Sequence, residues 1–552
     1  MVCFVTNSGY IDSNAAAGLR LALAEEFSSL YVFNLRGNSR NSGEAGKREA
    51  GNVFNVRVGA AIMVLVKNPD ATRHGLLHYR DIGDYLTREQ KLSLIAEYGS
   101  IDGVPWEPLI PNESGDWLNQ RDDTFGTFTS IGDKAAPGRA VFKTHSAGLQ
   151  TNRDAWVYSS SRVLVERNVK RMISVYNAEV DRWEASDHSK SIEDFVDTDA
   201  TRISWARSLR AALKKGTRLE FDPSLTTSSV YRPFNKQNVY FAPLLNHERG
   251  QMPRMFPTAE QDNLGFYYVG MGSAVPFSVL MIDSLPDLHV TGAGSGGQFF
   301  PRYTYEARGG DTELDIFGDS DPFTRVDNVT DEILAEYQRL YGVEVTKDDV
   351  FFFIYGLLHA SDYREIYAAD LKKMLPRIPK LADASDFVSF VEAGRKLSAL
   401  HLDYEAVEPY PLEMVVSASR PSQVPDLRVA KMRFAGKAGA WDKSTIRFND
   451  EITLTGIPDA AHEYLLGSRS AIEWIIERYR VKTDKDSGIV NDPNDWAAEH
   501  DDPEYILNLL KRIVTVSVGT VKIVSSLPSL KRLAEIEEGS ENAMDTYRKG
   551  VE

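Results

Sequence analysis

The chain has 552 residues, of which 42% are hydrophobic and 26% are charged, so it has ample material for packed cores and does not resemble a disordered protein. This length predicts roughly three or four domains. The formal net charge of −16 argues against indiscriminate binding to nucleic acid, because phosphate contacts need a positive surface; any such contact must be local.

Three further properties narrow the class of protein. The longest apolar runs, residues 61–66 and 350–358, are far shorter than the roughly 20 residues that cross a bilayer, so no membrane span is expected. The amino-terminal sequence lacks the basic region of a secretory signal. Cys3 is the single cysteine, which excludes an internal disulfide and a cysteine-based zinc site. We therefore expect a cytoplasmic protein.

The first 72 residues predict an α/β arrangement. Residues 2–6 form an apolar run that is closed by Asn-Ser-Gly, which is typical of a buried strand ending in a turn. A helix should follow, because apolar side chains recur at helical spacing through residues 14–27. Two more strands are predicted at 30–34 and 60–66, separated by a loop rich in Gly and Asn.

The rest of the chain changes character twice. Residues 73–145 are rich in Gly, Pro and Trp and predict a connecting segment with one helix, which begins near Thr87. Residues 146–325 alternate basic helical stretches with short aromatic strands, which indicates an α+β domain. Residues 326–552 are mainly helical, apart from a break rich in Pro and Gly, with short strand-like pieces, at about 405–460.

Several short motifs fail on inspection. The glycines of residues 292–297 satisfy G-x-G-x-x-G but lead into an aromatic, strand-like stretch instead of the helix that a dinucleotide needs. Asp70, Glu89 and Lys91 mimic a nuclease cluster, yet a capping box at Thr87 predicts that the last two lie on different sides of a helix. The ten histidines are scattered, so a metal site is not expected.

Long segments of the chain resemble one family. Residues 2–38 resemble the later half of the amino-methyltransferase fold, in which a strand ends in a polar turn and feeds a helix, and more narrowly they resemble Type ISP restriction-modification enzymes. Five further segments look like that family's target-recognition and carboxy-terminal parts: GLQTNRDAWVY (148–158), ISWARSLRAALKKG (203–216), VYRPFNKQNVYF (230–241), YGLLHASDYREIYAADLKKMLPRIP (355–379) and AIEWIIERYRVKTDKDSGIVNDPNDW (471–496). Their appearance in order is more specific than any short motif.

The resemblance implies a domain plan. Residues 1–72 would be the end of a Rossmann-like adenine N6-methyltransferase domain and 73–145 a connection. Residues 146–325 would be an α+β target-recognition domain, and 326–552 a mainly helical specificity region. Because the first part would hold only some strands of a doubly wound sheet, we expect one open edge with an apolar surface.

In this family one polypeptide joins a nuclease, an ATP-dependent translocase, a methyltransferase and a target-recognition domain, so S-adenosylmethionine, ATP and magnesium are implied for the full-length enzyme. The sequence contains no Pro-Pro dipeptide. It therefore lacks the [N/D/S]-P-P-[Y/F/W] loop that holds a flipped base for methylation. We expect no catalytic residue and no cofactor in this chain alone, which a truncated gene, a split gene or a misplaced start codon would each explain. Its partners would be double-stranded DNA and the missing amino-terminal portion.

One short loop is a candidate for reading bases. Gln150, Asn152 and Arg153 carry side chains capable of bidentate contacts to base edges. The alternative is a capped turn, in which Asn152 and Asp154 hold the backbone. The two interpretations are equally supported by the residues.

A second set of residues is a candidate for phosphate contact. Residues 201–218 contain six basic side chains and no acidic one. Within them Arg207, Arg210 and Lys214 recur at helical spacing and make one basic stripe. The alternative is a solvated helix face. Three more candidates, Arg232, Lys236 and Arg254, lie beside aromatic residues.

Two other functions stay open from the residues. The chain could be a complete enzyme with an unrecognised site near Asn7, Ser8 and Asp12, in the turn after the first strand. It could also be a scaffold whose helical end binds another protein.

Overall fold

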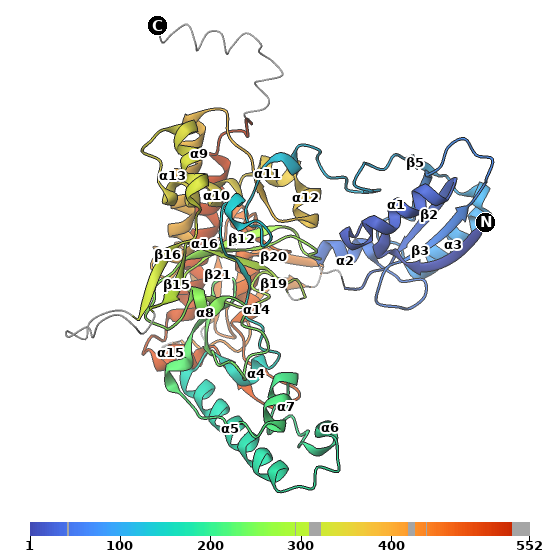
Figure 1. The fold of residues 1–552 in the computed structure, drawn as a ribbon. Coiled ribbons are helices and arrows are strands. Elements are labelled where there is room, and N and C mark those ends of the chain that lie inside the picture. Colours follow the sequence, from blue (N-terminus) through green and yellow to red (C-terminus); the bar gives the residue numbers. More distant parts are fainter. Residues whose placement is uncertain (41–42, 293, 309–321, 418–424, 438, 533–552) are drawn as a thin grey trace, which may run out of the picture. The chain divides into compact units, whose positions relative to one another are not determined.

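The computed structural model describes residues 1–40, 43–292, 294–308, 322–417, 425–437 and 439–532 (Figure 1). They divide into two compact units. The first unit comprises Met1–Thr129, Gly270–Phe277 and Asp362–Pro379, and the second comprises Ser130–Val269, Ser278–Ser361 and Lys380–Glu552. No helix among the described residues has both the length and the apolar character needed to cross a membrane.

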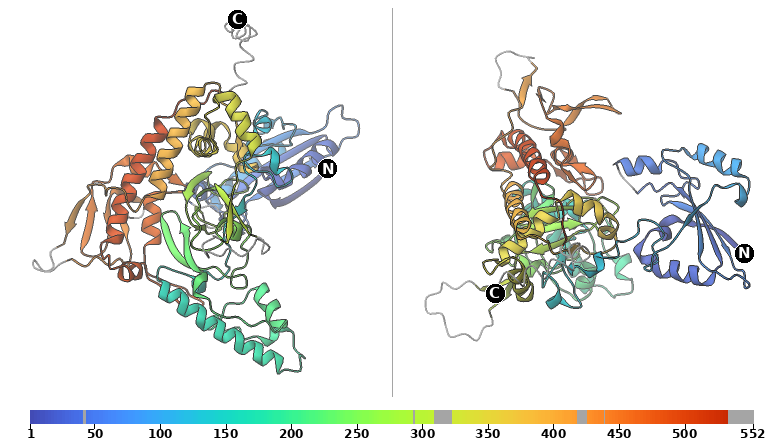
Figure 2. Two further views of the ribbon diagram at one scale, coloured as in Figure 1. Left: turned by 60° about the vertical axis from the view of Figure 1, so that its left-hand side comes forward. Right: turned by 90° about the horizontal axis from the view of Figure 1, so that it is seen from above.

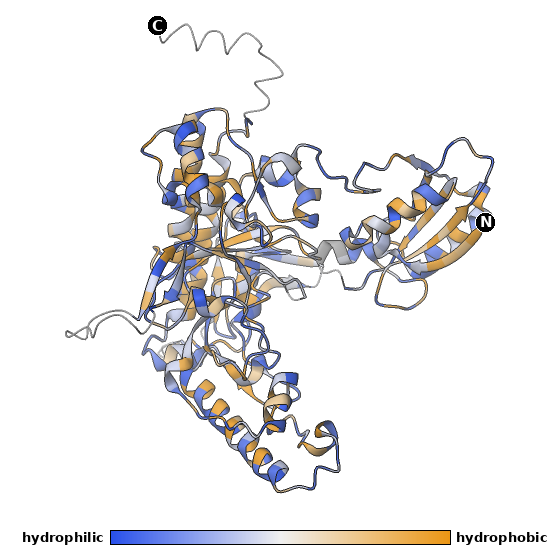
Figure 3. Ribbon diagram, viewed as in Figure 1, coloured by the Kyte–Doolittle hydropathy of each residue, from blue (hydrophilic) through white to orange (hydrophobic). Residues whose placement is uncertain are grey.

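A five-stranded mixed sheet forms the centre of the first unit. Its order is β1 (Val2–Asn7), β3 (Ala60–Val66), β2 (Ser29–Arg36), β4 (Leu76–Asp81) and β5 (Glu107–Leu109). Strand β3 runs antiparallel to both of its neighbours, whereas β2 and β4 are parallel. The strands are largely orange in Figure 3, because apolar side chains pack on both faces of the sheet. The three strands predicted at 2–6, 30–34 and 60–66 are confirmed.

The strands β4 and β5 lie in the segment that the sequence predicts to be a connection, and they extend this sheet. Helices α1 (Ala17–Glu26), α2 (Gly43–Glu49) and α3 (Arg88–Tyr98) accompany it. The predicted capping box begins α3, since the backbone N–H of Gln90 donates to Thr87 Oγ1 at 3.2 Å. Lys91 is buried and donates to the carbonyl oxygens of Leu35 and Glu49, so it is a structural lysine and not part of a nuclease cluster.

The open edge of the sheet is β1. Its residues are exposed apart from Thr6, and they include the apolar Val2, Phe4 and Val5. Among the residues that the structure describes, its backbone pairs with β3 on one side and with no strand on the other. An edge of this kind presents unpaired N–H and C=O groups together with apolar side chains.

The first unit contains a buried cluster of charged residues around Asp116. The carboxylate of Asp116, which is inaccessible to solvent, accepts hydrogen bonds from Arg121 and lies 3.0 Å from Lys373 Nζ and 3.5 Å from Arg20 Nη2. Burial raises the pKa of Asp116, but the hydrogen bonds from Arg121 and Lys373 outweigh it and lower that pKa to about 2. Lys373 ends α12 (Ala368–Lys373), so the cluster joins two distant parts of the sequence.

The second unit contains three four-stranded sheets. The first has the order β13 (Leu285–Pro286), β9 (Thr226–Arg232), β10 (Asn235–Tyr240) and β8 (Tyr158–Ser159). The second has β12 (Ser278–Ile282), β11 (Gly265–Val269), β14 (Gln298–Pro301) and β7 (Ser146–Ala147). The third has β18 (Glu413–Val416), β21 (Ile452–Thr455), β20 (Ala440–Arg447) and β19 (Arg433–Lys437). Strand β14 begins directly after residues 292–297, where the sequence predicts a strand-like stretch instead of a helix.

Three helices pack side by side in the second unit: α10 (Lys347–Leu357), α13 (Ala384–Leu402) and α16 (Tyr505–Ser525) (Figure 2). Glycines allow the first two to cross closely, because a Cβ on Gly394 would lie 1.8 Å from the carbonyl oxygen of Phe352. His401 joins all three, with Nδ1 2.5 Å from the hydroxyl of Tyr355 and Nε2 2.9 Å from Thr520 Oγ1.

The longest of the remaining helices, α5 (Arg162–Glu184), lies with α6 (Ile192–Phe195) and α7 (Arg207–Lys214) at the lower end of the view in Figure 1. The others are α4 (Asp154–Val157), α8 (Met252–Met255), α9 (Asp331–Tyr341), α11 (Ser361–Ile366), α14 (Ala471–Arg478) and α15 (Asn494–Glu499). The second unit also holds short strand pairs, which are β15 (Tyr303–Ala307) with β16 (Phe323–Asp327), β22 (Leu465–Leu466) with β23 (Arg469–Ser470) and β24 (Lys482–Thr483) with β25 (Val490–Asn491).

Candidate nucleic-acid interface

The recognition loop, residues 149–154, is held between two other segments of the second unit. Leu149 donates its N–H to Pro286 and accepts from Leu288, at 2.8 and 2.9 Å. Gln150 exchanges two backbone hydrogen bonds with Glu248, both at 2.9 Å. These pairings fix the path of the backbone into the loop.

Side chains fix the far end of the loop. Asp154 begins α4, and its carboxylate accepts hydrogen bonds from the Thr151 hydroxyl and from the Tyr231 hydroxyl, the latter at 2.9 Å. The backbone of Asn152 between these anchors has a φ of 55°, in the left-handed region that Asn tolerates better than most residues. Gln150 Nε2 donates to Asn152 Oδ1 at 3.0 Å. The exposed side chain of Asn152 is therefore presented from an ordered turn.

Arg153 is buried next to Asn152 without a partner. Only 4% of the residue is exposed, and none of its three guanidinium nitrogens has a hydrogen-bond partner among the described residues. Burial lowers the pKa of Arg153 to about 10. A buried cation without a counter-charge costs free energy, which a ligand could recover by supplying acceptors.

Arg232 is a buried ion-pair partner and not a surface cation. Its Nη1 lies 2.7 Å from Asp287 Oδ1, and both side chains are less than a tenth exposed. Asp287 Oδ1 also accepts the backbone N–H of His289 at 2.9 Å. The expectation that Arg232 contacts DNA stays a prediction: Nη1 is bound to Asp287, Nε has no hydrogen-bond partner among the described residues, and the residue lines the pocket beside the recognition loop.

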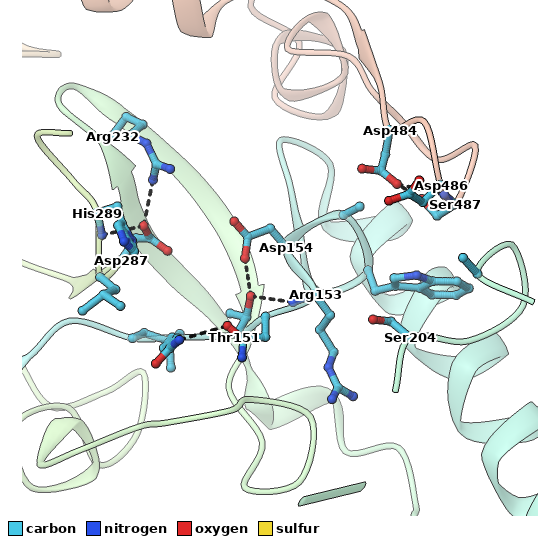
Figure 4. Close-up of a pocket in the computed structure, with 17 residues that line it drawn as sticks. Thr151, Arg153, Asp154, Ser204, Arg232, Asp287, His289, Asp484, Asp486 and Ser487 are labelled. Carbon is cyan, nitrogen blue, oxygen red and sulfur yellow. Dashed lines mark hydrogen bonds and ion pairs between the residues drawn. The ribbon is translucent and has the colours of Figure 1, made fainter. Parts of the chain in front are cut away.

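Figure 4 shows the pocket that these groups line, with Thr151, Arg153, Asp154, Arg232 and Asp287 around it. Its volume is about 470 Å³. The turn between β24 and β25 also contributes, through Asp484, Asp486 and Ser487. In that turn Ser487 Oγ donates to Asp484 Oδ1 at 2.7 Å.

The basic stripe predicted on residues 201–218 lies on α7 and lines a second depression, the α7 groove, of about 710 Å³. Arg207 and Lys214 are exposed, Arg210 is half-buried, and no ion pair joins any of the three to an acidic residue in the described part of the chain. Two neighbours are already neutralised: Arg202 pairs with Asp197, and Arg218 with Asp181 and Glu184. Three cations without an acidic ion-pair partner among the described residues therefore line the groove, together with the carboxylate of Glu193.

The last two candidates are paired on the surface. Lys236 Nζ lies 3.6 Å from Asp283 and 3.5 Å from Glu405. Arg254 lies 3.4 Å from Glu306. Both keep a nearby acidic group, so each would have to exchange it to contact a phosphate.

The residues of the alternative enzyme site make structural contacts. Asn7 Oδ1 accepts the N–H of Gly9 at 2.7 Å, Ser8 donates its N–H to Gly59 at 2.9 Å, and Asp12 accepts from Asn119 at 2.8 Å. No group of three or more His, Cys, Asp and Glu side chains among the described residues is placed to hold a metal ion.

The sequence pattern of the Type ISP C-terminal specificity domain matches residues 140–509. The chain belongs to this family. The match covers the recognition loop, the α7 groove, all three four-stranded sheets of the second unit and the helices α10 and α13. It identifies the part of the chain that carries every candidate contact residue.

Solved structures resemble this Type ISP chain over 96% of its length. They are a nuclease-deletion mutant of the Type ISP restriction-modification enzyme LlaGI in complex with a DNA substrate mimic (40% identity, TM-score 0.82), the ATP-dependent Type ISP enzyme LlaBIII bound to DNA (34%, 0.83) and a DrdV–DNA complex (30%, 0.80). The chain spans 39%, 33% and 50% of those proteins. No curated protein matches it.

The sequence analysis missed two segments of the specificity domain that contribute residues to these sites. His188 and Lys190 line the α7 groove, although they belong to the loop between α5 and α6. Asp484 and Ser487 reach the recognition-loop pocket from more than 300 residues along the chain. Helical periodicity predicts the basic stripe on one helix, but it does not predict which loop packs beside that helix.

Proposed function

We propose that this chain recognises a specific duplex DNA sequence as the carboxy-terminal part of a Type ISP restriction-modification enzyme. The observation that carries the proposal is that three DNA-bound relatives share its fold over 96% of its length. The charge distribution supports it, since an acidic chain keeps unpaired cations in the α7 groove.

Within this proposal the two sites have different tasks. The recognition loop reads base edges through Gln150 and Asn152, because an ordered backbone can hold an amide in a fixed direction. The α7 groove contacts phosphates through Arg207, Arg210 and Lys214, whose charge carries no sequence information. Arg153 gains acceptors when DNA approaches the loop.

We further infer that the sheet of the first unit is the later half of a methyltransferase fold. Two features support this: the strands from residues 2–7, 29–36 and 60–66 adjoin in one sheet, and β1 leaves an edge open for a further strand. The remainder of that fold would supply the methyl-transfer pocket.

The residues of this chain do not fit the cofactors of the full-length family enzyme. S-adenosylmethionine chemistry on an adenine needs the Pro-Pro loop, which is absent from the sequence. The described residues likewise offer no acidic cluster for magnesium. We assign no step of methyl transfer, translocation or cleavage to this chain.

Selection from a random duplex library by the purified chain tests the proposal. We expect one short sequence to be enriched, and to bind more tightly than a scrambled duplex by about 10³-fold or more. Equal affinity for selected and scrambled duplexes would overturn sequence recognition. Transfer of a labelled methyl group to DNA by the chain alone would instead favour a complete enzyme.

A further inference from the structure

The sheet formed by β18, β21, β20 and β19 has one apolar and one basic face. Its sequence alternates strictly in two places, Lys431-Met-Arg433-Phe and Thr445-Ile-Arg447-Phe. Met432, Ile446 and Phe448 are buried beneath the sheet. The charged residues between them are exposed, which places Lys431, Arg433 and Arg447 on the outside. We call these three residues the basic sheet face.

The two arginines of this face are directly opposite each other. Arg433 pairs with Arg447 in the antiparallel register of β19 and β20, and Arg447 pairs with Thr453 on β21. Opposite positions of an antiparallel pair bring Cβ atoms to about 5 Å, and like charges there are destabilising. Among the residues that the structure describes, no acidic side chain forms an ion pair with Arg433, Arg447 or Lys431.

The basic sheet face lines a groove of about 950 Å³. Thr445 and Thr453 add hydroxyl groups to its lining. The carboxylates of Asp426, Asp450 and Glu451 also line the groove. Asp426 accepts the N–H of Arg428, and Glu451 accepts the N–H of Asp426. Among the described residues none of the three forms an ion pair with Arg433 or Arg447, so the two guanidinium groups can bind a ligand without first exchanging an acidic partner.

We propose that the basic sheet face binds the phosphate backbone of duplex DNA, as a contact separate from the recognition loop and the α7 groove. Two guanidinium groups side by side suit successive phosphodiesters, because each planar fork can donate two hydrogen bonds to one phosphate. A phosphate between them also relieves their mutual repulsion. This proposal rests on the proposed function, since it supplies a further grip on the same duplex.

Removing both charges tests the contact. The variant is Arg433→Gln/Arg447→Gln in the full chain, and its matched control is Arg339→Gln/Lys522→Gln, which removes two exposed charges from the same unit. Binding to a selected duplex is measured by fluorescence anisotropy from low to high KCl. We expect the slope of log affinity against log salt to fall by about 0.9 for each phosphate that the variant no longer neutralises, with no change in the control.

Two further measurements keep the result interpretable. Arg433→Lys/Arg447→Lys keeps both charges and should retain most of the salt slope. The melting temperature of the glutamine variant should equal or exceed that of the wild type, because the substitution removes a repulsive pair. If the wild type binds the duplex and the glutamine variant has the salt slope of its control, the basic sheet face does not contact DNA and the proposed function stands. If the wild type binds no duplex, both proposals fail.

Discussion

The recognition loop and the α7 groove differ in how their polar groups are held. In the loop, Thr151 and Asp154 are hydrogen-bonded and Arg153 is buried, so each group has one position. In the groove, Arg207 and Lys214 are exposed on long side chains and pair with no acidic residue in the described chain. Fixed groups can discriminate between bases, whereas free charges bind every duplex alike.

The largest effect is expected beneath the loop. Arg232→Ala leaves the Asp287 carboxylate buried without its partner and should lower the free energy of unfolding by about 3–5 kcal/mol. Urea denaturation followed by tryptophan fluorescence measures the change. Arg254→Ala is the matched control, because its pair with Glu306 is exposed and should contribute at most about 1 kcal/mol. Equal losses in the two variants would contradict the buried pair.

Arg153→Leu separates stability from recognition. It removes an unpaired buried cation, so the unbound chain should become more stable by about 1–3 kcal/mol. Preference for the selected duplex should fall at the same time. A less stable variant with unchanged preference would mean that the Arg153 guanidinium contributes to folding and does not contact DNA.

Asn152→Gly tests the exposed amide and keeps the backbone, since glycine accepts a φ of 55° without strain. Discrimination at one base position should relax by about 1–3 kcal/mol, with the other positions unaffected. Competition binding with single-base variants of the selected duplex measures this. An even loss across all positions would assign Asn152 to phosphate contact instead.

The smallest effect is expected in the groove. Arg207→Gln should weaken binding to selected and scrambled duplexes by the same factor and reduce the salt slope by about 0.9. Arg218→Gln is the control on the same part of the chain, because Asp181 and Glu184 already neutralise Arg218. A change of sequence preference in Arg207→Gln would contradict the assignment of sequence-independent phosphate contact to the α7 groove.

Local patterns predicted the elements well. The three strands of the first unit and the capping box at Thr87 depend on neighbouring residues, and the structure confirms them. The strands β4 and β5 escaped prediction because they lie among Gly, Pro and Trp residues, and β5 has only three residues. The place of β4 in the sheet is set by pairing with β2 and that of β5 by pairing with β4, which no local pattern records.

Only the structure distinguishes the exposed candidate residues from those that are buried in ion pairs. Arg207 and Arg232 are both candidates for DNA contact in the sequence, yet one is exposed and the other is buried against Asp287. The difference arises because Asp287 lies 55 residues further along the chain and reaches Arg232 through the pairing of β13 with β9. Long-range pairing of charges is the information that single-sequence reasoning lacks.

The buried cluster around Asp116 constrains the order of folding on the ribosome. Synthesis runs from the amino terminus, and domains generally fold as units when their residues have emerged. Arg20 and Arg121 can pair with Asp116 early, but Lys373, the third cation of the cluster, is made about 250 residues later, so the cluster is complete only then. The residues of the recognition loop and the α7 groove are synthesised before Lys373, so they leave the ribosome before the charge cluster of the first unit can be completed.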